Sequence, residues 1–297
     1  MPSHIKETGN DRVFNIVNIL ILLVFAITIL YPLVYIVSAS FSSPLAVVSG
    51  RVWLLPVQPT LEGYAAVFKH RLIVSSFMNS IYYMAVGTSI NVVLTLMAAY
   101  VLSRKNFMPR NIVMALFVFT MMFSGGLIPT YLVVKELGMI DSRWALIIPG
   151  ALAVWNMIIT RTYFQMTIPE ELLEASQIDG CSDFTFLRKV VIPLSGPIVA
   201  VIALFYAVGH WNQYFSALLY LKSQSLYPLQ LVLRDILVQN EVDSSMISDV
   251  ADTMARDSLR ELLKYSLIVV STLPMLVIYP FIQRYFVKGM LIGSLKG

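Results

Sequence analysis

Apolar residues gather in six windows of membrane-spanning length along the 297-residue chain. A transmembrane helix needs about 20 consecutive, predominantly apolar residues. The windows cover residues 16–37, 75–102, 112–134, 144–160, 197–221 and 265–282. His210 is their one ionisable residue of the Asp, Glu, Lys, Arg and His types. The pattern predicts an all-α, polytopic membrane protein with six transmembrane helices, because a charge at mid-bilayer costs several kcal/mol.

The first window is read as a retained span, because its apolar run exceeds the about 7–15 residues of a signal peptide. Basic residues orient the spans, since cytoplasmic segments carry an excess of Lys and Arg. Residues 103–111 and the tail from Arg284 each carry three bases and no acid. Both termini are therefore expected in the cytoplasm, with long outer loops at about 38–74 and 222–264. We expect residues 1–297 to form a single transmembrane domain.

Composition supports a membrane protein and excludes several other classes. The chain is 58% hydrophobic and 13% charged, with a mean hydropathy of +0.76. Soluble domains average about 45–50% apolar residues and about 25% charged residues. The chain's single cysteine, Cys181, permits no internal disulfide, and no metal-ligand spacing occurs. A net charge of +4 does not indicate nucleic acid. We expect a lipid bilayer around the chain, and no metal or nucleic acid bound to it.

A charged stretch, PEELLEASQIDGCSDFTFLRKVVIPLSGP, separates the fourth and fifth windows. Thr167 is expected to cap a first short helix and Ser182 a second, with Pro169 in the first turn. Gly180 is expected to adopt the left-handed conformation between them. The first helix has no Lys or Arg, although membrane-surface helices are usually rich in both. Docking onto a partner protein is thus favoured over binding to lipid headgroups.

The same stretch resembles the cytoplasmic loop of ABC importer permeases. That loop carries Glu-Ala-Ala, three residues, Gly, nine residues, Ile, any residue and Leu-Pro. Here it stands as Glu174-Ala175-Ser176, Gly180, Val190 and Ile192-Pro193; Ser176, Val190 and Ile192 are small departures. Three further segments resemble the maltose-permease-like carbohydrate branch, nearest to subunits linked to complex oligosaccharides. They are FSGGLIPTYLVVKELGMIDSRWALIIPGA, YPLQLVLRDIL and YPFIQRYFVKGMLIGSLKG.

The resemblance covers nearly the whole chain and implies the type I ABC importer permease fold. It implies a permease subunit of the bacterial inner membrane that imports a sugar, with an oligosaccharide as the expected substrate. The implied partners are a sister permease forming a heterodimer, two ATPase subunits holding ATP and Mg, and an extracytoplasmic sugar-binding protein. The 165–196 loop would couple to the ATPase, the 222–264 loop would face the binding protein, and the tail would enter the ATPase interface. The residues expected to act in coupling are Glu170, Glu174, Ala175, Ser176, Asp179, Gly180 and Phe184.

Other function classes fit the sequence less well. The chain has no GxxxxGK[ST] motif, so no nucleotide-phosphate cradle is expected in it. No nucleophile elbow or intramembrane carboxylate pair points to catalysis; we expect no catalytic residue and no cofactor in this chain. An ion-coupled secondary transporter usually places acids or bases in its spans, where this chain offers His210. A non-transporting structural membrane subunit is the alternative that the sequence excludes least well.

Aromatic and amide residues near mid-depth are candidates for a sugar translocation path. They are Asn156, Trp211, Asn212 and Tyr214, with Trp155 at the same depth as Asn156. Such residues also serve helix packing and membrane interfaces, so both interpretations stay open. His210 is favoured as a hydrogen-bonded packing residue, and residues 124–126 as a helix-packing site. In maltose-type systems the sister permease can hold most sugar contacts, which weakens a path assignment to this chain.

Overall fold

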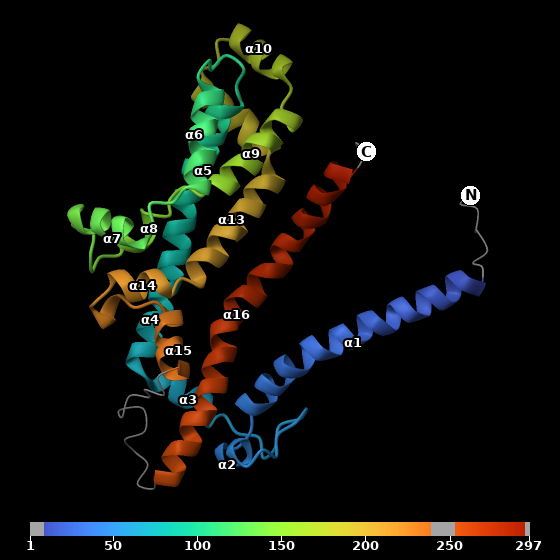
Figure 1. Ribbon diagram of the computed structural model, residues 1–297, viewed down its shortest axis with the longest axis vertical. Coiled ribbons are helices and arrows are strands. Elements are labelled where there is room, and N and C mark those ends of the chain that lie inside the picture. Colours follow the sequence, from blue (N-terminus) through green and yellow to red (C-terminus); the bar gives the residue numbers. More distant parts are fainter. Residues whose placement is uncertain (1–8, 239–252, 295–297) are drawn as a thin grey trace. The chain divides into compact units, whose positions relative to one another are not determined.

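The computed structural model describes residues 9–238 and 253–294, and the chain forms two compact units (Figure 1). The first unit comprises Met1–His70 and Asn240–Val270, and the second Arg71–Gln239 and Ser271–Gly297. The regular structure of the described residues is helical and includes no β-strand, as the all-α prediction requires. That residues 1–297 form a single domain stays a prediction.

The first predicted span is helix α1 (Gly9–Ser40) of the first unit. None of its most apolar 18-residue window is buried within the protein. An apolar surface of this size calls for lipid or another protein chain rather than water. Only its last three residues, from Ser38 to Ser40, are buried. The helix is thus anchored at one end, where the ring of Tyr35 meets that of Tyr265 edge-on at 5.7 Å.

The expected outer loop at 38–74 contains regular structure. It holds helices α2 (Pro44–Val48) and α3 (Glu62–Lys69). Gly63 of α3 lies against the first-unit part of α16 (Thr253–Ser294): a Cβ there would come within 2.9 Å of Leu262 Cγ. The loop is therefore packed, and only its connections lack helical structure.

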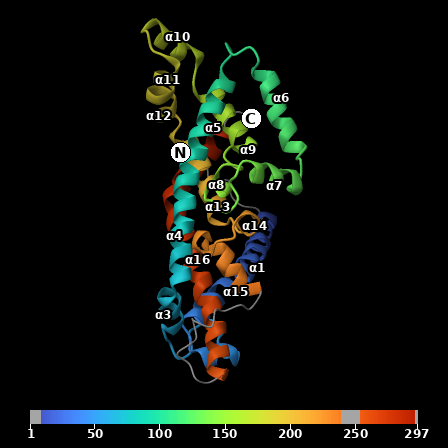
Figure 2. The same ribbon diagram turned by 90° about the vertical axis from the view of Figure 1, so that its left-hand side faces the viewer.

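The longest span of the second unit is the continuous helical segment Arg71–Ser103. It consists of α4 (Arg71–Tyr82), the π-helical turn η1 (Tyr83–Gly87) and α5 (Thr88–Ser103). Helix α5 packs beside α9 (Val154–Thr167) and α13 (Gly196–Trp211), as Figures 1 and 2 show.

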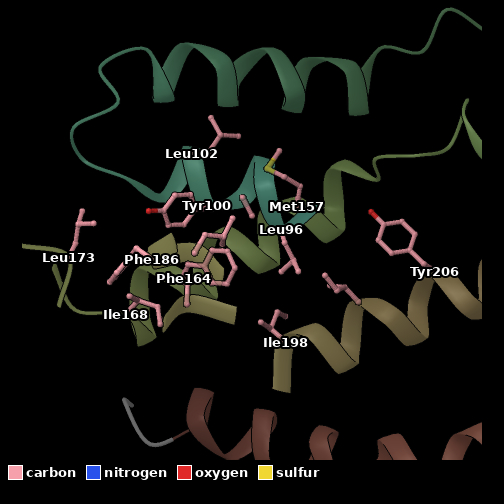
Figure 3. Packing of buried hydrophobic residues seen from close by; sticks show 14 residues of the cluster. Leu96, Tyr100, Leu102, Met157, Phe164, Ile168, Leu173, Phe186, Ile198 and Tyr206 are labelled. Carbon is pink, nitrogen blue, oxygen red and sulfur yellow. The ribbon is translucent and has the colours of Figure 1, made fainter. Parts of the chain in front are cut away.

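One buried cluster joins α5, α9, α13 and the 165–196 loop (Figure 3). Leu173, Phe186 and Tyr100 lie at one end of it and Tyr206 at the other. Between membrane helices such contacts stabilise mainly through van der Waals packing, because lipid tails are as apolar as the side chains. The cluster therefore depends on close fit. Its largest buried members include Phe164, Phe186, Met157 and Ile202.

The chain bends sharply within the third predicted window and again just before the fifth. Helices α6 (Arg110–Met122) and α7 (Leu127–Glu136) meet at 113°, and the segment before Ser195 meets α13 at 87°. Gly126 has a φ of +86°, which glycine adopts without strain. A Cβ at Gly126 would meet nothing within 4 Å. Gly126 is thus needed to turn the chain and packs against no other helix among the described residues; that residues 124–126 serve packing against another subunit stays a prediction.

The fourth and fifth windows are interrupted. Helix α8 (Trp144–Ile147) ends before Pro149, and α9 begins only at Val154, because proline lacks an N–H donor and disfavours helix in the residue before it. Helix α14 (Phe215–Tyr220) follows α13 after a short break. In the described part of the chain, three helices meet the length and apolarity of a span, or five if each bent pair counts as one. The remaining short elements are α10 (Glu170–Ile178), α11 (Asp183–Phe186), η2 (Leu187–Val191), α12 (Ile192–Leu194), η3 (Gln224–Leu226) and α15 (Leu229–Val238).

His210 packs against the π-helical turn. The residue is 7% exposed, and its Nδ1 lies 3.2 Å from Gln213 Oε1, as the packing interpretation predicts. A Cβ on Gly87 would lie 2.6 Å from His210 Cε1 and 2.8 Å from Cδ2. Gly87 thus leaves the space that the imidazole fills between η1 and α13.

Gly87→Ala is expected to destabilise the second unit by about 1–3 kcal/mol, the usual cost of overpacking. The measurement is thermal unfolding of the purified protein in detergent. Gly209→Ala is the matched control, because a Cβ there meets nothing within 4 Å. In a His210→Ala background the Gly87→Ala change should cost little. A full cost in that background would show that the imidazole is not what the new methyl group strikes.

Candidate functional site

Side chains from neighbouring elements satisfy the backbone at the break between α8 and α9. Asn91 of α5 donates from Nδ2 to the carbonyl of Gly150 at 3.2 Å. Gln213, after α13, donates from Nε2 to the carbonyl of Leu146 at 2.9 Å. A backbone group left unpaired at membrane depth costs several kcal/mol. These two amides therefore stabilise the non-helical backbone.

Tyr206 completes this support from α13. Its hydroxyl accepts a hydrogen bond from the backbone N–H of Ala153 at 3.0 Å. The same hydroxyl lies 2.6 Å from Thr95 Oγ1 of α5. The last residue before α9 is thus fixed to two other helices. We call Asn91, Gln213 and Tyr206, which together hold the break, the break clamp.

A cavity of about 700 Å³ lies beside the break. Trp155 and Asn156, in the first turn of α9, line it. Trp155 is 59% exposed, whereas Asn156 is 5% exposed. The side-chain amide of Asn156 has no hydrogen-bond partner among the described residues. The cavity therefore offers an open aromatic face next to an unpaired amide.

Of the four candidates for the sugar translocation path, Asn156 lines the cavity. Trp211 is 1% exposed and donates from Nε1 to the carbonyl of Ser271 at 2.9 Å. Its ring meets Phe77 edge-on at 5.8 Å. Trp211 is thus a buried packing residue in this structure and does not line the cavity.

Asn212 and Tyr214 also lie outside the cavity lining. Asn212 donates from Nδ2 to the carbonyl of Val208, one turn earlier in its own helix. Tyr214 is 44% exposed, and its ring lies against Phe215. Trp155 lines the cavity, whereas three of the four path candidates do not. The sequence placed Trp155 at the same depth as Asn156 but did not include it among the candidates. Pro149-Gly150 was the available signal, because interrupted helices often border binding sites in transporters.

The 165–196 loop folds largely as expected. Gly180 has a φ of +73° and ends α10 in a Schellman motif, with Gly180 N–H bonded to Gln177 O and Cys181 N–H to Ser176 O. Ser182 Oγ accepts from Thr185 N–H at 3.4 Å and caps α11. The cap predicted at Thr167 is wrong.

That residue ends α9, and Pro169 occupies the cap position of α10. The reason is that Pro169 disfavours helix at the residue before it, so Ile168 is extended.

An aromatic clasp joins this loop to the end of α5. The guanidinium of Arg104 lies 4.3 Å from the ring centre of Tyr100 and 5.1 Å from that of Phe186. Tyr100 donates from its hydroxyl to Asp183 Oδ1 at 3.4 Å. Cation–π contacts of this kind contribute about 0.5–2 kcal/mol. Helix α5 is thus tied to α11 as well as to the break clamp.

Glu170 is the one coupling candidate that forms an ion pair with its own chain in the described residues. Its partner is Lys105, whose pKa is raised chiefly by the hydrogen bond to this carboxylate. Glu174, Ala175 and Asp179 are exposed on α10 and its end. Ile178 is 87% exposed and Phe184 66%. The loop therefore presents a mixed acidic and apolar surface of the kind that docks onto a protein. That these residues contact an ATPase stays a prediction.

A carboxylate clasp holds the start of the 222–264 loop. Asp141 Oδ1 accepts from the N–H groups of Lys222 and Ser223 at 2.9 and 2.8 Å. Its Oδ2 accepts from Ser223 Oγ at 2.6 Å. The Ser223 hydroxyl, followed by the two N–H groups, lowers the pKa of Asp141. The loop leads into α15, and residues 239–252 lie outside the described residues.

The Asp141 clasp should weaken in acid. A carboxyl group with a depressed pKa stabilises the structure above its unfolded pKa of about 3.9, and this stabilisation is lost as the pH falls through the folded pKa. Amide protection at Lys222 and Ser223, measured by hydrogen exchange relative to intrinsic rates, should hold from pH 7 to about 5 and fall below about pH 4. Asp141→Ala should lose it at every pH, and the control Glu136→Gln should keep it. Protection in Asp141→Ala equal to wild type would contradict the clasp.

Comparison with known proteins adds a family match. Residues 91–292 match the family described as binding-protein-dependent transport system inner membrane component. This range includes the break clamp, the cavity and the 165–196 loop.

Two relatives from Bacillus subtilis (strain 168) resemble nearly the whole chain. The polygalacturonan/rhamnogalacturonan transport system permease protein YtcP is 42% identical over 97% of this chain and 99% of its own. Protein LplC is 43% identical over 98% of this chain and 97% of its own. Among solved structures, a bacterial ABC transporter involved in import of the acidic polysaccharide alginate has a chain with a TM-score of 0.88. It is 35% identical and the match covers 94% of this chain and 99% of that one.

Proposed function

Because the chain belongs to the family of binding-protein-dependent transport system inner membrane components, we propose that it is a permease subunit of an ATP-driven importer of oligosaccharides. The names of the relatives support a sugar: one is a polygalacturonan/rhamnogalacturonan permease, and the similar solved structure belongs to an alginate importer. Oligosaccharides released from galacturonan are therefore the first substrates to test.

The proposed division of labour leaves this subunit without covalent chemistry. The sequence has no phosphate-binding loop, so ATP and Mg would bind to two separate cytoplasmic ATPase subunits. A sister permease would supply the other side of the sugar path, and an extracytoplasmic binding protein would deliver the sugar. Both termini would lie in the cytoplasm. The outer loop at 222–264 would contact the binding protein, and the tail, whose residues 295–297 lie outside the described residues, would reach the ATPase interface.

The observation that carries the proposal is the double attachment of α5. In its first turn, Asn91 holds the break beside the cavity. At its end, Tyr100 and Arg104 hold the 165–196 loop. From Asn91 to Arg104 is about 20 Å of helix at 1.5 Å per residue. A displacement of the loop by the ATPase would therefore reach the cavity through one continuous helix.

The docking surface can be tested by two substitutions in the 165–196 loop. Glu174→Lys reverses an exposed charge and should loosen the ATPase more at low salt than at high salt, because salt screens surface charges. Gly180→Val should cost about 1–2 kcal/mol at the positive φ and reduce sugar uptake about tenfold whatever the salt. The measurements are ATPase co-purification and uptake in membranes that hold the whole complex.

Matched controls exist at and just after the end of α7. Glu136→Lys makes the same charge change, and Gly138→Val strains a glycine with a similar φ of +67°. Neither should alter ATPase retention. Wild-type retention and uptake in both loop variants would count against the coupling assignment.

The aromatic clasp predicts a separate defect. Arg104→Ala removes the cation between the Tyr100 and Phe186 rings, so the ATPase should still bind while the sugar imported per ATP hydrolysed falls about tenfold. Arg110→Ala, at the first residue of α6, is the control with the same loss of charge. The ratio is measured in proteoliposomes. An equal loss in both variants would mean that general charge, and not the clasp, is responsible.

A further inference from the structure

The cavity beside α9 contains the elements of a carbohydrate subsite within this chain alone. Trp155 presents a largely open indole, and the neighbouring Asn156, which also lines the cavity, is 95% buried and has no side-chain hydrogen bond among the described residues. An amide without a protein partner can exchange hydrogen bonds with a ligand or water in the cavity.

The two side chains are held in place before any ligand arrives. They occupy the first turn of α9, directly after the break that Asn91 and Tyr206 fix. An aromatic ring on a fixed backbone gives a large contact area at low conformational cost. At about 700 Å³, the cavity lies within the roughly 300–1,000 Å³ of small-molecule sites, which combine aromatic walls with a few polar groups.

The residues that line the cavity favour hydroxyl groups of a ligand over carboxylates. Among the described residues that line the cavity, none is Asp, Glu, Lys or Arg, and the ionisable His210 is bonded to Gln213 and packed against Gly87. A carboxylate placed here would lose water without gaining a Lys or Arg partner from this chain, and that is costly. Hydroxyl groups are different, because Asn156 can both donate to them and accept from them.

We propose that Trp155 and Asn156 form a subsite for one pyranose unit of the transported oligosaccharide. The apolar C–H face of the ring stacks on Trp155, and its hydroxyl groups bond to Asn156. The subsite recognises the sugar ring and not a carboxylate; the carboxylate of a uronic acid unit points away from this chain. This inference rests on the proposed function for its ligand and goes further in assigning part of the sugar contact to this subunit.

The test uses the whole complex in proteoliposomes with two probes. One is a short oligogalacturonide, and the other is the same oligomer with its carboxyl groups reduced to alcohols. Trp155→Ala should raise the KM for uptake about tenfold for both probes, with Trp155→Phe less than threefold. Asn156→Ala should raise it about fivefold for both. Trp144→Ala is the control, because this half-exposed tryptophan does not line the cavity.

A second readout does not need transport. Asn156→Cys in a Cys181→Ser background puts a single thiol in the cavity, and either probe should slow its alkylation by a maleimide at least threefold. The single native cysteine makes this background simple to build.

Each outcome supports or overturns the proposed subsite. Unchanged KM values, or a fall in kcat alone, would overturn the subsite, as would a KM effect limited to the acidic probe. Loss of the sister permease from the purified Trp155→Ala complex would assign the indole to a subunit interface instead. If the wild type imports neither probe, protection of the thiol upholds the subsite and refutes only the proposed substrates. Absence of both import and protection overturns both.

Discussion

A peptide group inside a bilayer must find a hydrogen-bond partner within the protein, and this requirement governs the second unit. The fourth apolar segment is interrupted at Pro149, which leaves backbone groups without helical hydrogen bonds. Three side chains from outside that segment bond to these groups. Only because these partners exist can α9 begin where it does. Its first turn then borders a cavity instead of lying in the middle of a continuous, fully packed helix.

Helix α5 connects the break between α8 and α9 to the opposite end of the unit. It contributes an amide to the break and two residues to the contact with the 165–196 loop. Its inner face carries the buried cluster that also takes in α9 and α13. Because interiors packed in this way transmit displacement rather than absorb it, loop, helix and cavity should move together.

The sequence predicted what depends on neighbouring residues. Apolar windows located the helices, and Gly180 and Ser182 predicted the turn and cap that the structure confirms. It did not predict the interruption of the fourth window, because hydropathy averages over Pro149 and Gly150. Nor could it show that Asn91 bonds to a carbonyl 59 positions away, or that Glu170 pairs with Lys105. These contacts depend on tertiary packing, and they decide which mid-depth residue faces the cavity and which, like Trp211, is buried.

The π-helical turn η1 has a consequence for the phase of the long Arg71–Ser103 segment. A π turn holds one more residue than the α-helical turn it replaces, and one residue corresponds to about 100° of rotation. The segment can therefore aim Asn79 and Tyr83 at the backbone of residues 225–227 and still aim Asn91 at the break. Loss of a single residue between Tyr83 and Gly87 would put these two faces out of phase. The length of this segment is thus fixed by angular registration between its two ends and not by membrane thickness alone.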